Sequence, residues 1–225
     1  AEGVKELIEE GYDPNTILPS GNSLLNAAIL ENAFKTAKYL INHKKIKIDL
    51  RNQSDETPLM LACLRGNLDL VKLLIYRGAD VNKTGWTPLH YAASAGRVDI
   101  MKFLIDKYAY IDAISPSGNT PLMMATLYGD EKSVLYLLSQ EADPTILNGA
   151  KRNAIQLAKA SERFTLAEIL EESSKKWIIE AAQEKLLSDK ADAELQKQIA
   201  EEKQKQKKIA EDKQLALIRQ QQQDL

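Results

Sequence analysis

The residues that could carry out chemistry are few and lie far apart in the chain. Its 225 residues include two histidines, His43 and His90, and a single cysteine, Cys63. A nucleophile needs a neighbouring base, and a zinc site needs three or four closely spaced His, Cys or carboxylate ligands. These three residues meet neither requirement, and no glycine-rich phosphate loop accompanies them. We therefore expect no catalytic residues, no metal site and no cofactor, and we interpret the chain as not being an enzyme.

A repeated triplet indicates what the chain builds instead. Thr-Pro-Leu begins at Thr57, Thr87 and Thr120, and weaker versions begin at Ser23 and Asn153. The five starting positions are separated by 34, 30, 33 and 33 residues. A period near 33 residues is typical of a solenoid of stacked repeats.

Each copy of the repeat predicts two short helices. In the copy that begins at Thr87, the threonine can cap the first helix, and Pro88 suits its first turn because a proline there loses no hydrogen bond. The apolar spacing over 98–106 predicts an amphipathic second helix. Residues 4–15 match residues 71–82 at seven of twelve positions. The chain is therefore expected to open with the second helix of an earlier repeat, with further chain upstream of Ala1.

Two motifs suggest a family. Residues 87–92 read Thr-Pro-Leu-His-Tyr-Ala, and residues 78–82 read Gly-Ala-Asp-Val-Asn. They resemble the ankyrin repeat signature, T-P-L-H-x-A with a G-A-D-x-N turn, and the resemblance covers Val4 to about Glu172. It implies an all-α solenoid of helix-turn-helix repeats with β-hairpin fingers, and a protein that binds another protein. In that family the histidine bonds within and between repeats, so the resemblance implies a structural role for His90.

The composition changes after about Glu172. The remainder contains no Gly and no Pro and is rich in Ala, Glu, Lys, Gln and Leu, which favour helices. We predict two domains: residues 1–172, an ankyrin repeat domain of about five repeats whose first lacks its first helix, and residues 173–225, a C-terminal helical extension. We expect one long helix from about Ser174 to Arg219, in which Trp177, Ile178, Ala181 and Ala182 pack on the last repeat.

The role of this C-terminal helix is left open. Leu187, Ala191, Leu195 and Ile199 form a narrow apolar stripe. Residues 200–214, in which only Ile209 and two alanines are apolar, are too thin for a self-sufficient coiled coil. The helix could cap the repeats, cover the binding groove, or pair with another molecule. We expect a monomer, with self-association through the helix as the alternative.

One loop departs from the repeat length. Asp80 and Thr87 are seven residues apart, whereas the equivalent residues of the other copies are ten apart, for example Asp143 and Asn153. Surface loops tolerate length changes at small free-energy cost, so a neutral deletion is the simpler interpretation. The alternative is a notch in the row of fingers that makes room for a partner.

The binding surface is predicted from equivalent positions in successive copies, because a solenoid presents a continuous concave face. In the middle three copies these positions hold aromatic, apolar and arginine side chains, which often anchor interfaces. Trp86 is the strongest candidate, because its finger position offers no core to enter. The predicted partner-binding residues are Trp86, Tyr91, Leu64, Arg65, Met124, Leu127, Tyr128, Glu56 and Asn119.

The partner is expected to be another protein. Exported bacterial ankyrin proteins suggest a hydrolytic enzyme that the chain caps and inhibits for self-protection. The alternative is a scaffold or adaptor that links two proteins through its repeats and its C-terminal helix. Ala1 and Glu2 would suit a signal-peptide cleavage site, so the localisation is left open between exported (periplasmic) and cytoplasmic.

Two other classes of partner are not expected. Phosphate binding needs clustered Lys and Arg, and with a net charge of −2 and no evident basic segment we expect no nucleic acid. No apolar run approaches the ~20 residues that span a bilayer. We therefore expect no membrane partner.

Overall fold

The structure, a computed structural model, describes the main chain of residues 2–223 and the side chains of residues 2–205. Within these bounds it is helical and contains no named strand, which confirms the predicted fold class. None of the described helices is both long and apolar enough to cross a membrane. The helices are α1 (Glu2–Glu9), α2 (Leu24–Leu30), α3 (Phe34–Asn42), α4 (Pro58–Arg65), α5 (Leu68–Tyr76), α6 (Pro88–Ser94), α7 (Val98–Asp106), α8 (Pro121–Tyr128), α9 (Glu131–Ser139), α10 (Ala154–Ala160) and α11 (Phe164–Gln223).

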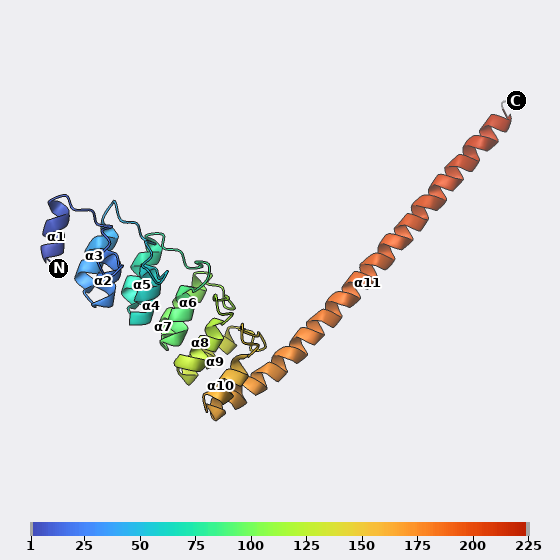
Figure 1. The fold of residues 1–225 in the computed structure, drawn as a ribbon. Coiled ribbons are helices and arrows are strands. Elements are labelled where there is room, and N and C mark those ends of the chain that lie inside the picture. The colour runs from blue at the N-terminus through green and yellow to red at the C-terminus, as the bar shows by residue number, and fades with distance from the viewer. Residues whose placement is uncertain (1, 224–225) are drawn as a thin grey trace. The chain divides into compact units, whose positions relative to one another are not determined.

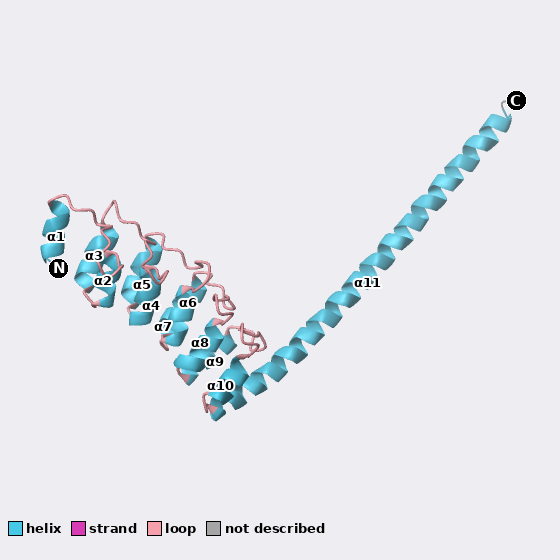
Figure 2. Ribbon diagram, in the orientation of Figure 1, coloured by secondary structure: helices cyan, strands magenta, loops and turns pink. Residues whose placement is uncertain are grey.

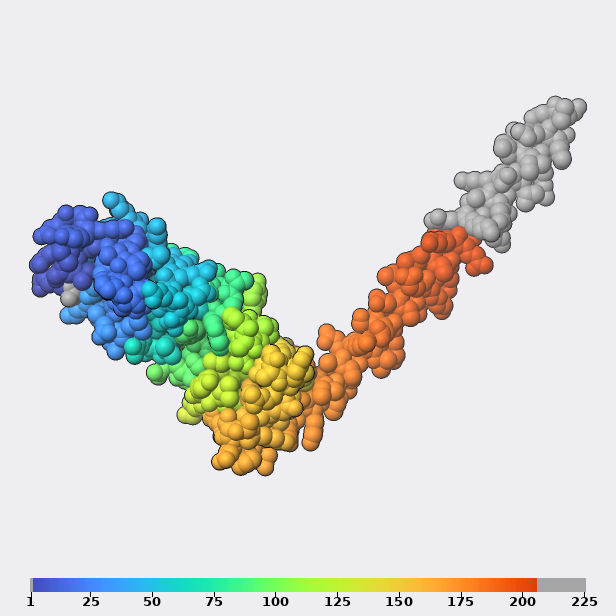
Figure 3. Space-filling view, viewed as in Figure 1, coloured from blue at the N-terminus to red at the C-terminus, as the bar shows by residue number. Residues whose placement is uncertain are grey.

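The helices before α11 form two stacked rows (Figure 1). One row holds α2, α4, α6, α8 and α10, the first helices of the repeats, and the other holds α1, α3, α5, α7 and α9, the second helices. Figure 2 shows the longer loops along one edge of the stack, and Figure 3 shows successive repeats packed side by side. Each repeat buries its apolar faces against its neighbours, as the solenoid prediction requires.

The Thr-Pro-Leu triplets begin first helices, as predicted. Thr57, Thr87 and Thr120 stand immediately before α4, α6 and α8, and each hydroxyl accepts a hydrogen bond from the backbone N–H three residues later. The proline that follows each threonine occupies the first turn, where no backbone donor is needed. The repeated triplet is therefore a repeated helix start.

The core is a continuous apolar layer along the two rows. Equivalent leucines of successive helices are at most 1% exposed, so each repeat contributes the same buried side chains at the same places. The leucines of the first helices are Leu25, Leu59, Leu89 and Leu122, and those of the second helices are Leu40, Leu74, Leu104 and Leu137.

The fingers between repeats are tight turns. Each of four fingers is closed by a backbone hydrogen bond across its base, for example from Asn52 N to Glu56 O at 3.1 Å and from Asn148 N to Arg152 O at 2.9 Å. The only β pairing that the described residues form outside named strands is an isolated bridge between Ile17 and Ser23. A five-residue finger is too short for a ladder, so the expected hairpins are present as turns and not as paired strands.

The long helix begins earlier than predicted. α11 starts at Phe164, not near Ser174, because the second helix of the last repeat continues into the C-terminal segment with no Gly or Pro to end it. Leu166, Ala167 and Leu170 are buried. Beyond these residues Trp177 is half-buried, whereas Ile178 is 56% exposed and Ala181 and Ala182 are also exposed. The packing of these four residues on the last repeat stays a prediction.

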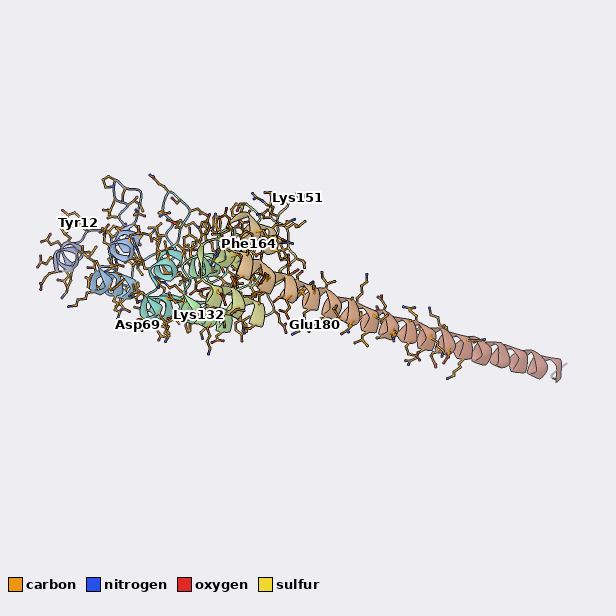
Figure 4. All side chains as sticks on the ribbon, turned by 90° about the horizontal axis from the view of Figure 1, so that it is seen from below. Tyr12, Asp69, Lys132, Lys151, Phe164 and Glu180 are labelled. Atoms are coloured by element: carbon orange, nitrogen blue, oxygen red, sulfur yellow. The ribbon has the colours of Figure 1, made fainter. Side chains whose placement is uncertain are left out.

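The chain divides into two compact units, Ala1–Ser174 and Lys175–Leu225. Along α11 the side chains of residues 181–205 are exposed on all sides of the helix (Figure 4). The apolar stripe that the sequence indicates is exposed, with Leu187 at 67% and Leu195 at 54%. The domain boundary after residue 172 stays a prediction.

The position of the last buried apolar residues predicts where the chain can be shortened. A chain that ends at Ser174 keeps Leu166, Ala167 and Leu170 and should unfold at nearly the same temperature as the full chain. A chain that ends at Arg163 loses these residues and should unfold at least about 5 °C lower. Thermal unfolding followed by circular dichroism checks both. Equal loss of stability in both chains would contradict this boundary.

A close backbone approach gives a second prediction. A Cβ on Gly129 would lie 2.5 Å from the Ala93 carbonyl oxygen and 2.9 Å from that of Ala125. Gly129→Ala should therefore lower the free energy of unfolding by about 1–3 kcal/mol. Gly3→Ala in α1 is the matched control, because a Cβ there meets no atom within 4 Å. Urea unfolding checks this, and a change below about 0.5 kcal/mol for Gly129→Ala would be inconsistent with the contact.

Candidate partner-binding surface

The centre of the repeat stack contains a pocket of about 210 Å³. Its walls come from three successive first helices, α4, α6 and α8, and from the loop before α6. Four of the nine predicted partner-binding residues lie in these walls. The lining residues are Leu64, Trp86, His90, Tyr91, Ser94 and Met124.

A fifth predicted residue, Glu56, lies in direct contact with the pocket. The Tyr91 hydroxyl donates to Glu56 Oε1 at 2.9 Å, and Asn52 Nδ2 donates to Glu56 Oε2 at 2.8 Å. Burial raises the pKa of the Tyr91 phenol, and the hydrogen bond to Glu56 raises it further. Tyr91 therefore stays protonated at neutral pH, and its ring is held in one orientation.

Trp86 is less free than its position in the sequence indicates. We expected it to have no core to enter, yet it is half-buried. Its ring meets the His90 ring edge-on, with the centroids 5.3 Å apart and the planes at 80°. The short loop that carries Trp86 leads directly into the capped start of α6. Part of its surface still lines the pocket.

His90 is held as a neutral imidazole by the groups around it. The Thr87 backbone N–H donates to Nδ1 at 3.1 Å, and Nε2 lies 2.9 Å from the Asn119 carbonyl oxygen. Because a backbone N–H only donates and a carbonyl only accepts, the ring proton belongs on Nε2. Burial lowers the pKa of His90 to about 4, although the carbonyls of Asn119 and Ala113 act in the opposite direction.

Asn119 is occupied inside the scaffold. Its carbonyl accepts from His90, its Oδ1 accepts from Asn148 Nδ2 at 2.9 Å, and its Nδ2 donates to Ser117 Oγ at 3.1 Å. These bonds join one finger to the next. Its structural role is established by these contacts, whereas a contact with a partner stays a prediction.

The other three predicted residues lie outside the pocket. Arg65 is exposed at the end of α4 and lines a separate hollow of about 370 Å³ beside Phe34. Tyr128 ends α8 and is 68% exposed, while Leu127 packs partly against the core. The structure thus brings five of the nine predicted residues together and leaves four around them.

Comparison with known proteins agrees with this architecture. A sequence model of the family described as “Ankyrin repeats (3 copies)” matches residues 1–85 and 81–148. The chain belongs to the ankyrin repeat family. Ankyrin repeats imply a protein-binding module, so the expected class of partner is a protein.

Three curated relatives are much longer than the segment that they share with this chain. The nuclear factor NF-kappa-B p105 subunit of Gallus gallus is 33% identical over 157 residues, which are 66% of this chain and 16% of that protein. Protein glp-1 of Caenorhabditis elegans is 29% identical over 180 residues, 73% of this chain and 14% of that protein. Ankyrin repeat and SAM domain-containing protein 6 of Rattus norvegicus is 33% identical over 113 residues, 50% of this chain and 10% of that protein.

The lengths and the source organisms of these relatives are both informative. The chain spans at most 16% of their length, so it corresponds to one segment of each. All three are animal proteins, and they give no support to the expectation of an exported bacterial ankyrin protein.

The shortened ankyrin finger contains a residue that the sequence analysis missed. Lys83 is only 3% exposed, and its Nζ bonds to the Asp55 carboxylate of the preceding finger and to the Thr84 carbonyl oxygen at 3.0 Å. The bond from Lys83 lowers the pKa of Asp55. A lysine side chain thus bridges to the preceding finger where three residues of loop are missing. The short loop was the signal that could have drawn attention to it.

The cysteine that could have served as a nucleophile lies inside the core. Cys63 is fully buried, and burial raises the pKa of its thiol, which disfavours the reactive thiolate. In the part of the chain that the structure describes, no three His, Cys, Asp or Glu side chains are grouped so that they could hold a metal ion.

The buried His90 predicts how stability depends on pH. Its pKa is about 4 in the folded protein and about 6.5 in the unfolded chain, so below pH 6.5 the unfolded chain binds the extra proton. The stability of the protein is therefore complete above pH 6.5 and falls as the pH drops toward 4. At pH 5 the loss due to His90 should be about 2 kcal/mol.

The equivalent residue of another repeat provides the control. Gln156 occupies the place of His90 in the last repeat and makes the same cap, with its Oε1 accepting from Asn153 N at 3.0 Å. His90→Gln should keep the fold and remove this part of the pH dependence. Urea unfolding of both proteins at pH 7.5 and pH 5 measures the difference. Equal pH dependence in the two proteins would rule out His90 as the cause.

Proposed function

We propose that the ankyrin repeats, which we assign to residues 1–172, bind a partner protein at the surface around Trp86. The observation that carries the proposal is the pocket that joins Leu64, Trp86, Tyr91 and Met124 from three repeats. It combines apolar and aromatic walls with a polar rim, as binding sites for an anchoring side chain do. Tyr91 is fixed by Glu56, so little ordering is needed on binding.

The four remaining predicted residues extend this surface. Arg65 and Tyr128 are exposed at the ends of α4 and α8, Leu127 precedes Tyr128, and Asn119 lies in the finger before α8. We include all nine residues in the proposed surface, with the pocket at its centre. Inhibition of a hydrolytic enzyme would be one consequence of binding there, and an activity assay on the bound partner tests it.

A second candidate function is supported by the C-terminal helix. Leu187, Leu195 and Ile199 on α11 are 67%, 54% and 40% exposed. Exposed apolar surface of this kind often marks an interaction site. We propose that an adaptor role, in which the repeats hold one protein and residues 173–225 contact another, is the alternative to a single binding surface. Loss of only one of two partners when the chain ends at Ser174 would support the adaptor.

The first experiment is affinity capture with the double variant Trp86→Ala and Tyr128→Ala. Losing the indole wall and an adjacent exposed ring should weaken partner binding by at least about tenfold, because aromatic anchors contribute about 2 kcal/mol or more each. The wild-type chain, immobilised in native cell extract, should retain a protein that the variant does not. Quantitative mass spectrometry measures the difference.

The matched control is Tyr76→Ala with Tyr108→Ala. Both tyrosines are 85% exposed and lie on the second-helix side of the repeats, away from the pocket. This variant should retain the partner fully. Thermal unfolding must show that both variants are folded, because Trp86 also packs on His90. A partner held equally by both variants would overturn the assignment of the surface.

A further inference from the structure

A second charged surface lies on the other row of helices. The segment 32–48 contains five lysines and no Asp or Glu: Lys35, Lys38, Lys44, Lys45 and Lys47. Our expectation that no segment of the chain is rich in basic residues is wrong at this place, although the chain as a whole has a net charge of −2. The five lysines could have been read from the sequence, but the nearly balanced charge of the whole chain drew attention away from them.

The structure gathers part of this segment around a depression. The end of α3 and the following turn enclose about 610 Å³, and all five lysines of the segment are exposed. The depression, which we call the basic depression, has walls that are largely apolar carbon, with the lysine ammonium groups at their ends. Its lining residues are Lys38, Tyr39, Asn42, His43, Lys44 and Lys45.

The cations of the basic depression have no carboxylate partner. Among the described side chains, no ion pair involves Lys38, Lys44 or Lys45, whereas Lys83 and Lys159 elsewhere are paired. Lys45 does lower the pKa of one carboxyl, that of Asp13. Its contribution and that of Lys47 are smaller than that of the Asn15 backbone N–H. Like charges held together without a counter-ion favour the binding of an anion.

Neighbouring donors add to this charge. Arg77 of the next repeat reaches the rim, where its Nη1 donates to Asn42 Oδ1 at 3.3 Å. The Lys45 backbone N–H donates to His43 Nδ1 at 3.3 Å, which leaves the neutral ring's proton on Nε2, where no partner occurs in the described part of the chain. The basic depression therefore offers three ammonium groups, a guanidinium and an imidazole N–H.

The helix end itself does not cancel this charge. Lysines near a helix C-terminus stabilise it by offsetting the partial negative charge of the last carbonyls. That charge is only about −0.5, so three lysines leave a clear positive excess at the end of α3. Helix capping alone does not account for the cluster.

We propose that the basic depression binds a short acidic peptide segment of a partner protein, at a site separate from the Trp86 pocket. Carboxylates would meet the ammonium groups, and an adjacent apolar side chain would pack on the half-buried Tyr39 ring. A long polyanion fits less well, because α1 packs against α3 and carries the exposed acids Glu2, Glu6 and Glu9, which Glu10 directly follows. A nucleic acid or an anionic membrane extending past the depression would meet these glutamates.

The test uses the full chain and a fluorescein-labelled peptide of six glutamates, with a six-glutamine peptide for comparison. Fluorescence anisotropy should show binding of the glutamate peptide alone, weakening between about 50 and 300 mM salt as charges are screened. Lys44→Gln with Lys45→Gln should weaken binding at least about fivefold. Trp86→Ala should leave it unchanged, which keeps this proposal independent of the first.

The control variant removes the same charge elsewhere. Lys102 occupies in α7 the place of Lys38 in α3, and Lys132 is the second residue of α9 and is exposed on the same row (Figure 4). Lys102→Gln with Lys132→Gln should change binding less than twofold. Equal weakening by both double variants, or no binding of the glutamate peptide, would overturn the site. Tighter, Lys44- and Lys45-dependent binding of a single-stranded oligonucleotide or of phosphatidylserine vesicles would overturn the peptide assignment.

Discussion

Side chains that bond across repeat boundaries hold the solenoid in register. His90 Nε2 donates to the carbonyl of Asn119 in the next repeat, and Asn82 both donates to and accepts from the main chain of the repeat after it. Arg163 donates to two carbonyls at the end of α8, at 2.6 and 3.1 Å. Apolar burial supplies most of the stability but has no direction. These directional bonds therefore decide how each repeat is rotated on its neighbour.

The pocket around Trp86 is a product of that register. Leu64, Tyr91 and Met124 belong to three different helices, and no single repeat contains enough of the walls to form the site. The bond from Tyr91 to Glu56 links two of these repeats at the rim. The basic depression differs in this respect, because its lining residues lie within residues 38–45. A local change in stacking would alter the walls of the first site, whereas the second would lose only the contact with Arg77 at its rim.

The sequence predicts what recurs and fails where one repeat differs from the others. The repeat period, the threonine caps and the equivalent apolar positions recur in successive copies. The fold could therefore be predicted from the sequence. The burial of Trp86 and the role of Lys83 depend on one shortened loop, whose geometry no repeat rule contains. The start of α11 was misplaced because a composition change was taken for a helix boundary, although the helix passes through it. The lysines of the basic depression are evident in the sequence. They were missed because basic character was judged from the net charge of the whole chain.

The bridge from Lys83 to Asp55 also gives the array a fixed order. Arrays of identical repeats can be duplicated or shuffled, because every junction is the same. Here the third finger would bury an ammonium group without a counter-ion if another repeat preceded it, and leaving that buried donor unpaired costs about 1–3 kcal/mol. The repeat that carries Asp55 and the repeat that carries Lys83 must therefore be inherited as a pair. Recombination between copies of this gene segment would be tolerated at the other junctions before it was tolerated at this one.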